Sequence, residues 1–113
     1  MLYLAGPMRG LPDFNYAAFH KAAFDMRALG HQVFNPAEHH YAYEIGGIDG
    51  CLALDFQVLI GLCHEGVVVL DGWERSNGAR AEVFCTLALG RPVYRWHKHD
   101  LMEVSIDDYL VRK

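Results

Sequence analysis

Glu82 follows a short turn that is well suited to binding an anion. The turn covers residues 72–79, comes after the apolar run 66–70, and opens a helix-like stretch that ends at Gly90. A strand, a turn and a helix in this order place a carboxylate near the carboxyl end of a strand, where α/β proteins usually have their binding and catalytic residues. The simpler interpretation is an acid near the start of a helix that only interacts with the helix dipole.

Asp55 is a second carboxylate in an unusual setting. It falls within an apolar stripe at helical spacing, formed by Leu52, Phe56, Leu59 and Cys63. An acid in such a stripe is at least partly buried, and burial raises its pKa so that it can donate a proton near neutral pH. The pattern equally allows an acid at the margin of the stripe that bonds a neighbouring loop.

The elements that must position these acids alternate between short apolar runs and longer helical periods, which predicts βαβ units and a parallel sheet. We expect strands over residues 2–5, 31–35, 66–70 and 92–96, and helices over 14–29, 48–63 and 78–89. The residues after 97 are expected to add a fifth strand or a last helix. Residues 37–47 are expected to form a loop, either a mobile lid over a ligand or an ordinary surface loop; its aromatic and histidine residues are His39, His40, Tyr41 and Tyr43.

Right-handed crossovers on opposite faces place the first and third strands side by side. The expected fold is therefore an α/β, Rossmann-like three-layer sandwich with four or five parallel strands in the order 2-1-3-4(-5). The loops after strands one and three then open at one crevice. Their candidate anion-binding residues are Gly6, Arg9 and Gly10 in the first loop, and Ser76, Asn77 and Gly78 in the second. Glycines admit an anion to backbone N–H groups, a helix start attracts negative charge, and an arginine offers a fork of donors, so their convergence predicts a small anionic ligand.

The composition narrows the classes of protein. The 113 residues, 52% of them hydrophobic, predict a single domain over 1–113. A formal net charge of -4 without a basic cluster argues against binding to a nucleic acid duplex and favours a small-molecule partner. The first five residues lack a basic leader and are too short for a membrane span, so we expect a strand there. Three cysteines without a C-x-x-C pair favour reduced thiols in the cytoplasm. The histidines lack the spacing of a catalytic zinc site, so we expect neither metal nor cofactor.

Several segments together resemble the nucleoside 2-deoxyribosyltransferase-like family, which includes the 2'-deoxynucleoside 5'-monophosphate N-glycosidases and small, often phage-encoded relatives. They are YLAGPMRG at residues 3–10, the acid at Asp55, VVVL at 67–70 and SNGARAE at 76–82. The resemblance covers residues 3–93 and rests on the order and spacing of these pieces. It implies a flavodoxin-like parallel sheet and a homodimer or larger homo-oligomer.

The resemblance also implies roles for individual residues. The family's catalytic glutamate maps onto Glu82 and its helix-borne aspartate onto Asp55, while its strand-one tyrosine and following arginine match Tyr3 and Arg9. It implies that Glu82 attacks the anomeric carbon, that Asp55 protonates the departing base and that Tyr3 orients Glu82. Ser76 has the spacing of the serine that helps to hold a 5'-phosphate in the monophosphate-hydrolysing branch.

Pro7 is a departure from that branch, which has a serine at this place, so a hydroxyl and a backbone donor to phosphate are missing. The substrate therefore stays open between a nucleoside and a nucleotide. Trp73 and the tyrosines of residues 37–47 are candidates to stack on the base, although a lone tryptophan is as often a core residue. The main alternative function is a nucleotide-binding module without turnover, a sensor or sequestering protein on the same fold.

Overall fold

The computed structural model describes residues 1–105, except for the side chains of residues 40–44 and 48. A five-stranded sheet forms its centre, in the order β2-β1-β3-β4-β5. The strands are β1 (Leu2–Ala5), β2 (Val33–Phe34), β3 (Gly66–Val69), β4 (Val93–His97) and β5 (Asp100–Glu103). The helices are α1 (Tyr16–Ala28), α2 (His40–Leu62) and α3 (Asn77–Ala88), with short 3-10 turns η1 (Pro12–Asn15), η2 (Pro36–His39) and η3 (Trp73–Arg75).

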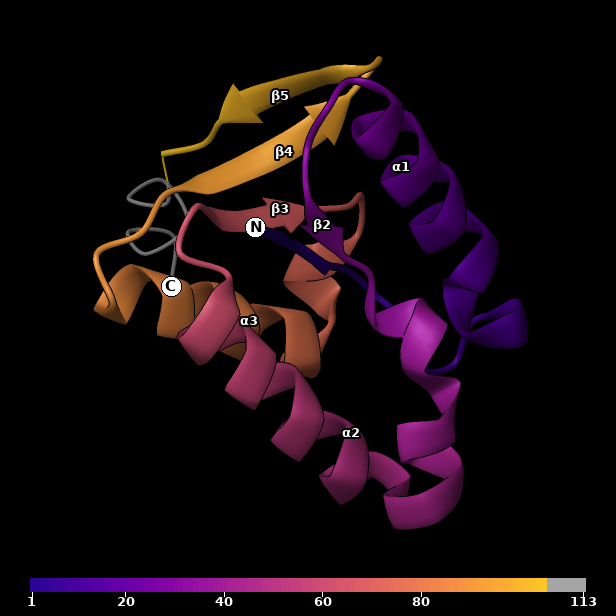
Figure 1. Cartoon of the computed structure of the whole chain (residues 1–113). Helices are drawn as coiled ribbons and strands as arrows, with labels where there is room; N and C mark the ends of the chain where they lie inside the picture. Colours follow the sequence, from indigo (N-terminus) through magenta and orange to yellow (C-terminus); the bar gives the residue numbers. More distant parts are fainter. Residues whose placement is uncertain (106–113) are drawn as a thin grey trace.

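The sheet separates two layers of helices, with α1 on one face and α2 and α3 on the other (Figure 1). The alternation of side chains along β1 makes this division clear. Leu2 and Leu4 pack with the buried face of α1, whereas Tyr3 and Ala5 pack on the side of α2 and α3. The predicted α/β three-layer sandwich and its strand order are therefore confirmed.

The fifth strand differs from the others in direction. β1 pairs in parallel with β2 and β3, and β3 in parallel with β4, but β5 is antiparallel to β4. Only Lys98 and His99 separate β4 from β5, and both have positive φ angles, of 47° and 69°. A two-residue turn of this kind builds a hairpin, whereas a parallel strand would need a long crossover.

The expected loop over residues 37–47 is wrong. The chain forms η2 and then enters α2 at His40, well before the expected start at residue 48. Gly47 has φ 62° and ψ -150°, a non-helical conformation at which two helical segments of α2 meet in a kink. The second segment therefore begins where a helix was expected, at residue 48. The side chains of Tyr41 and Tyr43 lie outside the described residues, and so does any lid that they would form. Within residues 1–105, none of the helices combines the length and the apolar character that crossing a bilayer requires.

Candidate active site

A pocket of about 290 Å³ opens at the carboxyl end of the sheet, where β1 and β3 lie side by side. The loop after β1, the helix α2 and the start of α3 form its walls. The strand order thus brings the loops after β1 and β3 to one crevice, as expected. The charged and polar side chains that line the pocket are Arg9, Asp55, Arg75, Ser76, Asn77 and Glu82.

Glu82 lies in the second turn of α3 and is only 7% exposed, although it lines the pocket. The hydroxyl of Tyr3 donates a hydrogen bond to Oε2 of Glu82. Tyr3 is fully buried in β1, and its ring stacks on Phe34 of β2 with centroids 5.4 Å apart. The core of the sheet therefore holds the tyrosine in place, and the tyrosine holds one oxygen of the carboxylate.

Asp55 reaches the same pocket from α2 and is half-buried. Its apolar neighbours along the helix include Leu59, which is buried in the core, and Leu52, which also lines the pocket. Asp55 is close enough to Glu82 to raise the pKa of that glutamate. Of the two interpretations of the sequence, the structure supports a carboxylate that faces a pocket.

The pKa values of both carboxyls are raised. Burial is the main cause in each case, and it raises the pKa of Asp55 to about 6 and that of Glu82 to about 8, with Asp55 adding to the shift of Glu82. The Tyr3 hydroxyl opposes this by lowering the pKa of both acids. Burial and the two acids in turn raise the pKa of Tyr3 well above its usual range, so that it stays a donor. Near neutral pH the two carboxyls together hold about one proton.

The start of α3 forms a polar end of the pocket. Ser76 caps the helix, and its Oγ accepts a hydrogen bond from the N–H of Ala79 at 3.2 Å. Asn77 and Gly78 follow it in the pocket wall, and a Cβ added at Gly78 would meet no atom within 4 Å. The first backbone N–H groups of a helix attract anions, so this end suits a negatively charged group.

Gly6 lines the pocket for a packing reason. A Cβ at this position would lie 3.0 Å from Cβ of Leu70 and 3.3 Å from Cζ of Phe19, so the loop can pass here only without a side chain. Gly10, which the sequence suggested as a second binding glycine, does not line the pocket and lies on the exposed side of the loop.

Trp73 does not face the pocket either. It belongs to η3, is only 6% exposed, and packs in the core with Ala79 and Val83 of α3. The short helical turn directs the indole inward beneath α3, so the suggestion that it stacks on a ligand is wrong.

Sequence reasoning missed the aromatic residues Phe14 and Tyr16, which line the pocket together with the core residue Phe19. The ring centroids of Phe14 and Tyr16 lie 5.6 Å apart. Phe14 is held by an unusual run of left-handed backbone, with φ values of 49°, 54° and 60° at Asp13, Phe14 and Asn15. Asn15 also donates from Nδ2 to the carbonyl of Pro7 at 3.0 Å, which closes the loop on itself. Strained backbone of this kind often occurs at functional sites. Asp13 and Asn15 were the available signal, because Asp and Asn adopt this conformation most readily.

No three or more histidines, cysteines or acids are grouped to hold a metal ion among the side chains that the structure describes. The pocket combines a buried and a half-buried carboxyl with a tyrosine donor, the start of a helix, two exposed arginines, and aromatic rings on the wall.

Comparison with known families matches the chain to the model described as "Domain of unknown function (DUF4406)", over residues 1–95. The matched part runs from β1 into β4 and includes every residue that lines the pocket. Neither the curated proteins nor the solved structures contain a match to the chain.

Proposed function

The chain belongs to the DUF4406 family, whose description names no activity, and we propose from its own site that it cleaves or transfers the N-glycosidic bond of a 2'-deoxynucleoside or its 5'-monophosphate. Glu82 is the nucleophile in this proposal, Asp55 the proton donor and Tyr3 the residue that orients Glu82. The observation that carries it is the buried hydrogen bond from Tyr3 to Glu82 in a pocket that also contains Asp55.

The first step breaks the bond between the sugar and the base. The Glu82 carboxylate attacks the anomeric carbon as the carbon–nitrogen bond breaks, and Asp55 gives its proton to the departing base. The product is a glycosyl ester on Glu82 and a free base. The charge that develops on the sugar is positive, as in an oxocarbenium ion, so a neighbouring carboxylate stabilises it.

The second step releases the enzyme. Water attacks the anomeric carbon of the ester, Asp55 takes the proton from the water, and Glu82 leaves as a carboxylate. A second base in place of water gives transfer instead of hydrolysis. Two displacements at the same carbon retain its configuration.

The proton shared by the two acids decides which form of the site is active. Attack requires an ionised Glu82 and a protonated Asp55, which is one proton on the pair. Free Glu82 has the higher pKa, at about 8, so in the active form this proton moves to Asp55. The hydrogen bond donated by Tyr3 stabilises the charged form of Glu82, which the attack requires.

The remaining pocket fits the rest of such a substrate. With the sugar beside the two carboxyls, the base lies against Phe14 and Tyr16, whose aromatic faces suit stacking. The 5' end of the sugar then points to Ser76, Asn77 and Gly78 at the start of α3.

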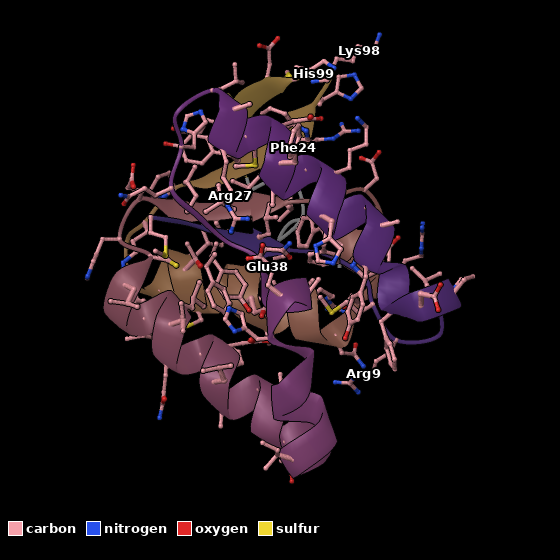
Figure 2. The ribbon with its side chains drawn as sticks, turned by 45° about the vertical axis from the view of Figure 1, so that its right-hand side comes forward. Arg9, Phe24, Arg27, Glu38, Lys98 and His99 are labelled. Atoms are coloured by element: carbon pink, nitrogen blue, oxygen red, sulfur yellow. The ribbon has the colours of Figure 1, made fainter. Side chains whose placement is uncertain are left out.

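The same proposal includes a cytoplasmic homodimer or larger homo-oligomer. Large apolar side chains are exposed on the outer surfaces of two helices, with Phe24 of α1 74% exposed and Ile45 of α2 84% exposed. Figure 2 shows Phe24 on the outward side of α1. Exposed apolar residues support an interface between copies of this chain. The free thiols of Cys51, Cys63 and Cys85 support a reducing compartment.

The test is base release from a panel of ribonucleosides, 2'-deoxyribonucleosides and their 5'-monophosphates, with and without an acceptor base, followed by chromatography. Glu82→Gln removes the nucleophile and is expected to abolish release. Glu74→Gln is the matched control, because Glu74 is exposed on η3 and does not line the pocket. If no member of the panel loses its base, yet one of them raises the melting temperature of both the natural protein and Glu82→Gln, the protein is a binding module without turnover.

A further inference from the structure

Arg75 is the last residue of η3, and its guanidinium folds back across Gly72 toward the loop after β1. A Cβ placed on Gly72 would lie 3.1 Å from Nη2 of Arg75 and 3.3 Å from Cγ of Pro7. The guanidinium and the proline ring therefore both border the space that a side chain at Gly72 would fill. The absence of a side chain at Gly72 leaves the room that this position of Arg75 needs.

Arg9 stands on the first loop, on another side of the same pocket. It is close enough to the thiol of Cys51, on α2, to oppose the rise in the pKa of that thiol. Figure 2 shows its side chain extending from the molecule on the side where α1 begins. Among the residues that the structure describes, neither Arg9 nor Arg75 forms an ion pair, although both line the pocket and are exposed. Two guanidiniums thus face the pocket without an acid to neutralise them.

We propose that Arg75 is a specificity-determining residue that, together with Arg9, makes the site prefer a 5'-phosphorylated substrate over the corresponding nucleoside. This inference rests on the proposed glycosidic function and narrows its substrate class to nucleoside 5'-monophosphates. Arg75 was not among the binding residues expected from the sequence.

The first loop offers few donors to an anion in this pocket, because Pro7 has no backbone N–H. The Oγ of Ser76 accepts from Ala79 and keeps its O–H free to donate, so an arginine adds to this donor. The side chain of Arg75 lines the pocket and can supply a planar fork of N–H donors, which matches two oxygens of a phosphate.

The charged groups of the pocket differ in burial. Glu82 is buried and Asp55 half-buried, whereas Arg9 and Arg75 are exposed. A phosphate monoester carries a charge of about -2 near pH 7 and interacts favourably with the two exposed arginines. A nucleoside has only a hydroxyl at this position and gains nothing from the second guanidinium.

The experiment compares kcat/KM for a 2'-deoxynucleoside 5'-monophosphate and for the same nucleoside, in the natural protein and in Arg75→Ala, Arg75→Lys and Arg95→Ala. Arg95 is the control, because it is an exposed arginine of β4 that pairs with Asp71 and does not line the pocket. Arg75→Ala is expected to lower kcat/KM for the monophosphate by about tenfold or more, the usual size of one charge-assisted hydrogen bond, and to leave the nucleoside unchanged. Arg75→Lys is expected to restore only part of the loss, because lysine lacks the fork. The preference for the monophosphate is also expected to decrease as salt is added, since both arginines are exposed.

An unchanged ratio in Arg75→Ala, or a natural protein that prefers the nucleoside, would overturn the inference. A binding measurement distinguishes failure of this inference from failure of the proposed glycosidic function. If no substrate is cleaved, calorimetric titration with the monophosphate, the nucleoside and inorganic phosphate still reports on Arg75. Weaker binding of the monophosphate and of phosphate to Arg75→Ala, with Arg95→Ala unaffected, upholds the role of Arg75 as an anion-binding residue, and equal binding rejects it.

Discussion

The hydroxyl of Tyr3 and the carboxylate of Glu82 are joined by a buried hydrogen bond, although 79 positions separate the two residues in the chain. Tyr3 belongs to the interior strand β1, and Glu82 belongs to α3, which packs on one face of the sheet. The bond therefore couples the most buried part of the core to the wall of the pocket. It also sets the position of a carboxylate that burial alone would favour in the neutral form.

Tyr3→Phe tests the role of this bond in catalysis. The change removes only the hydroxyl, so we expect the fold to persist while kcat falls by about 10- to 100-fold, the effect of losing a hydrogen bond to a charged group. Because the hydroxyl lowers the pKa of both Glu82 and Asp55, its loss is also expected to move the pH profile to higher pH. Tyr94→Phe is the control, since Tyr94 of β4 packs on the α1 side of the sheet. A profile that does not move would contradict a role for Tyr3 in tuning the acids.

The pH dependence of kcat/KM is expected to be bell-shaped, with limbs near pH 6 and pH 8. Below about 6 both Asp55 and Glu82 carry protons, so no nucleophile is present. Above about 8 both are ionised, so no acid protonates the base. The maximum therefore lies between these values, where the pair holds one proton. Initial rates of base release across pH 4.5–9.5 measure this, and a profile that rises steadily to pH 9.5 would exclude Asp55 as the proton donor.

Glu82→Gln is expected to increase the stability of the protein at alkaline pH. The pKa of Glu82 is about 8 in the folded protein and 4.5 ordinarily, so the folded chain binds a proton that the unfolded chain has released. The free energy of unfolding therefore decreases as pH rises from about 4.5 to about 8. Glutamine has no charge to bury and still offers an oxygen to Tyr3. Thermal unfolding should show that Glu82→Gln has a higher melting temperature than the natural protein, and that the difference is larger at pH 9 than at pH 5.

The substitution Glu74→Gln provides the comparison for that measurement. It removes the same charge from an exposed position, and we expect the difference in melting temperature from the natural protein to stay small at both pH values. An equal gain for Glu82→Gln at pH 5 and pH 9 would mean that burial does not hold Glu82 in the neutral form.

Gly66→Ala is expected to destabilise the sheet strongly. Gly66 has a φ of 120°, and an added Cβ would lie 2.3 Å from the carbonyl oxygen of Pro92. That oxygen accepts the N–H of Val67 at 3.2 Å, so β3 and β4 cannot separate locally without losing a bond. We expect a loss of several kcal/mol, measured by urea unfolding. Gly61→Ala is expected to have the opposite effect. Gly61 lies in α2, and an added Cβ would meet no atom within 4 Å. Because alanine loses less conformational freedom than glycine in a helix, the change should stabilise the protein by about 0.5–1 kcal/mol.

Most of the fold could be predicted from the sequence because handedness and periodicity decide it. The expected strand order is confirmed, and α1 and α3 begin and end within about two residues of their expected limits. The helical segment over residues 40–46 was not predicted, because Gly46 and Gly47 have the composition of a loop, whereas the segment after the kink at Gly47 begins where it was expected. The direction of β5 was not predicted either, since it depends on the backbone of Lys98 and His99, two residues without a strong turn signal.

Some residues of the site could also be predicted from the sequence, and others could not. Loops that end neighbouring strands must meet, so the grouping of Arg9, Ser76 and Glu82 around one pocket followed from the strand order. The place of Phe14 depends on three consecutive left-handed residues, and Arg75 reaches the pocket only because Gly72 leaves room for it. Such details arise from tertiary packing and have no periodic signal. For the same reason, the sequence did not predict that the side chain of Trp73 points into the core.

The helix α3 carries both the proposed nucleophile and the helix start that faces the 5' end of the proposed substrate. Ser76 caps it and Glu82 lies six positions later, so at 1.5 Å per residue about 9 Å of helix axis separate them. In the proposed reaction, this helix fixes the separation between the carboxylate at the anomeric carbon and the backbone N–H groups that face the 5' end of the substrate. The further phosphates of a di- or triphosphate would then have to extend beyond the helix start, so the proposal favours substrates with at most one phosphate.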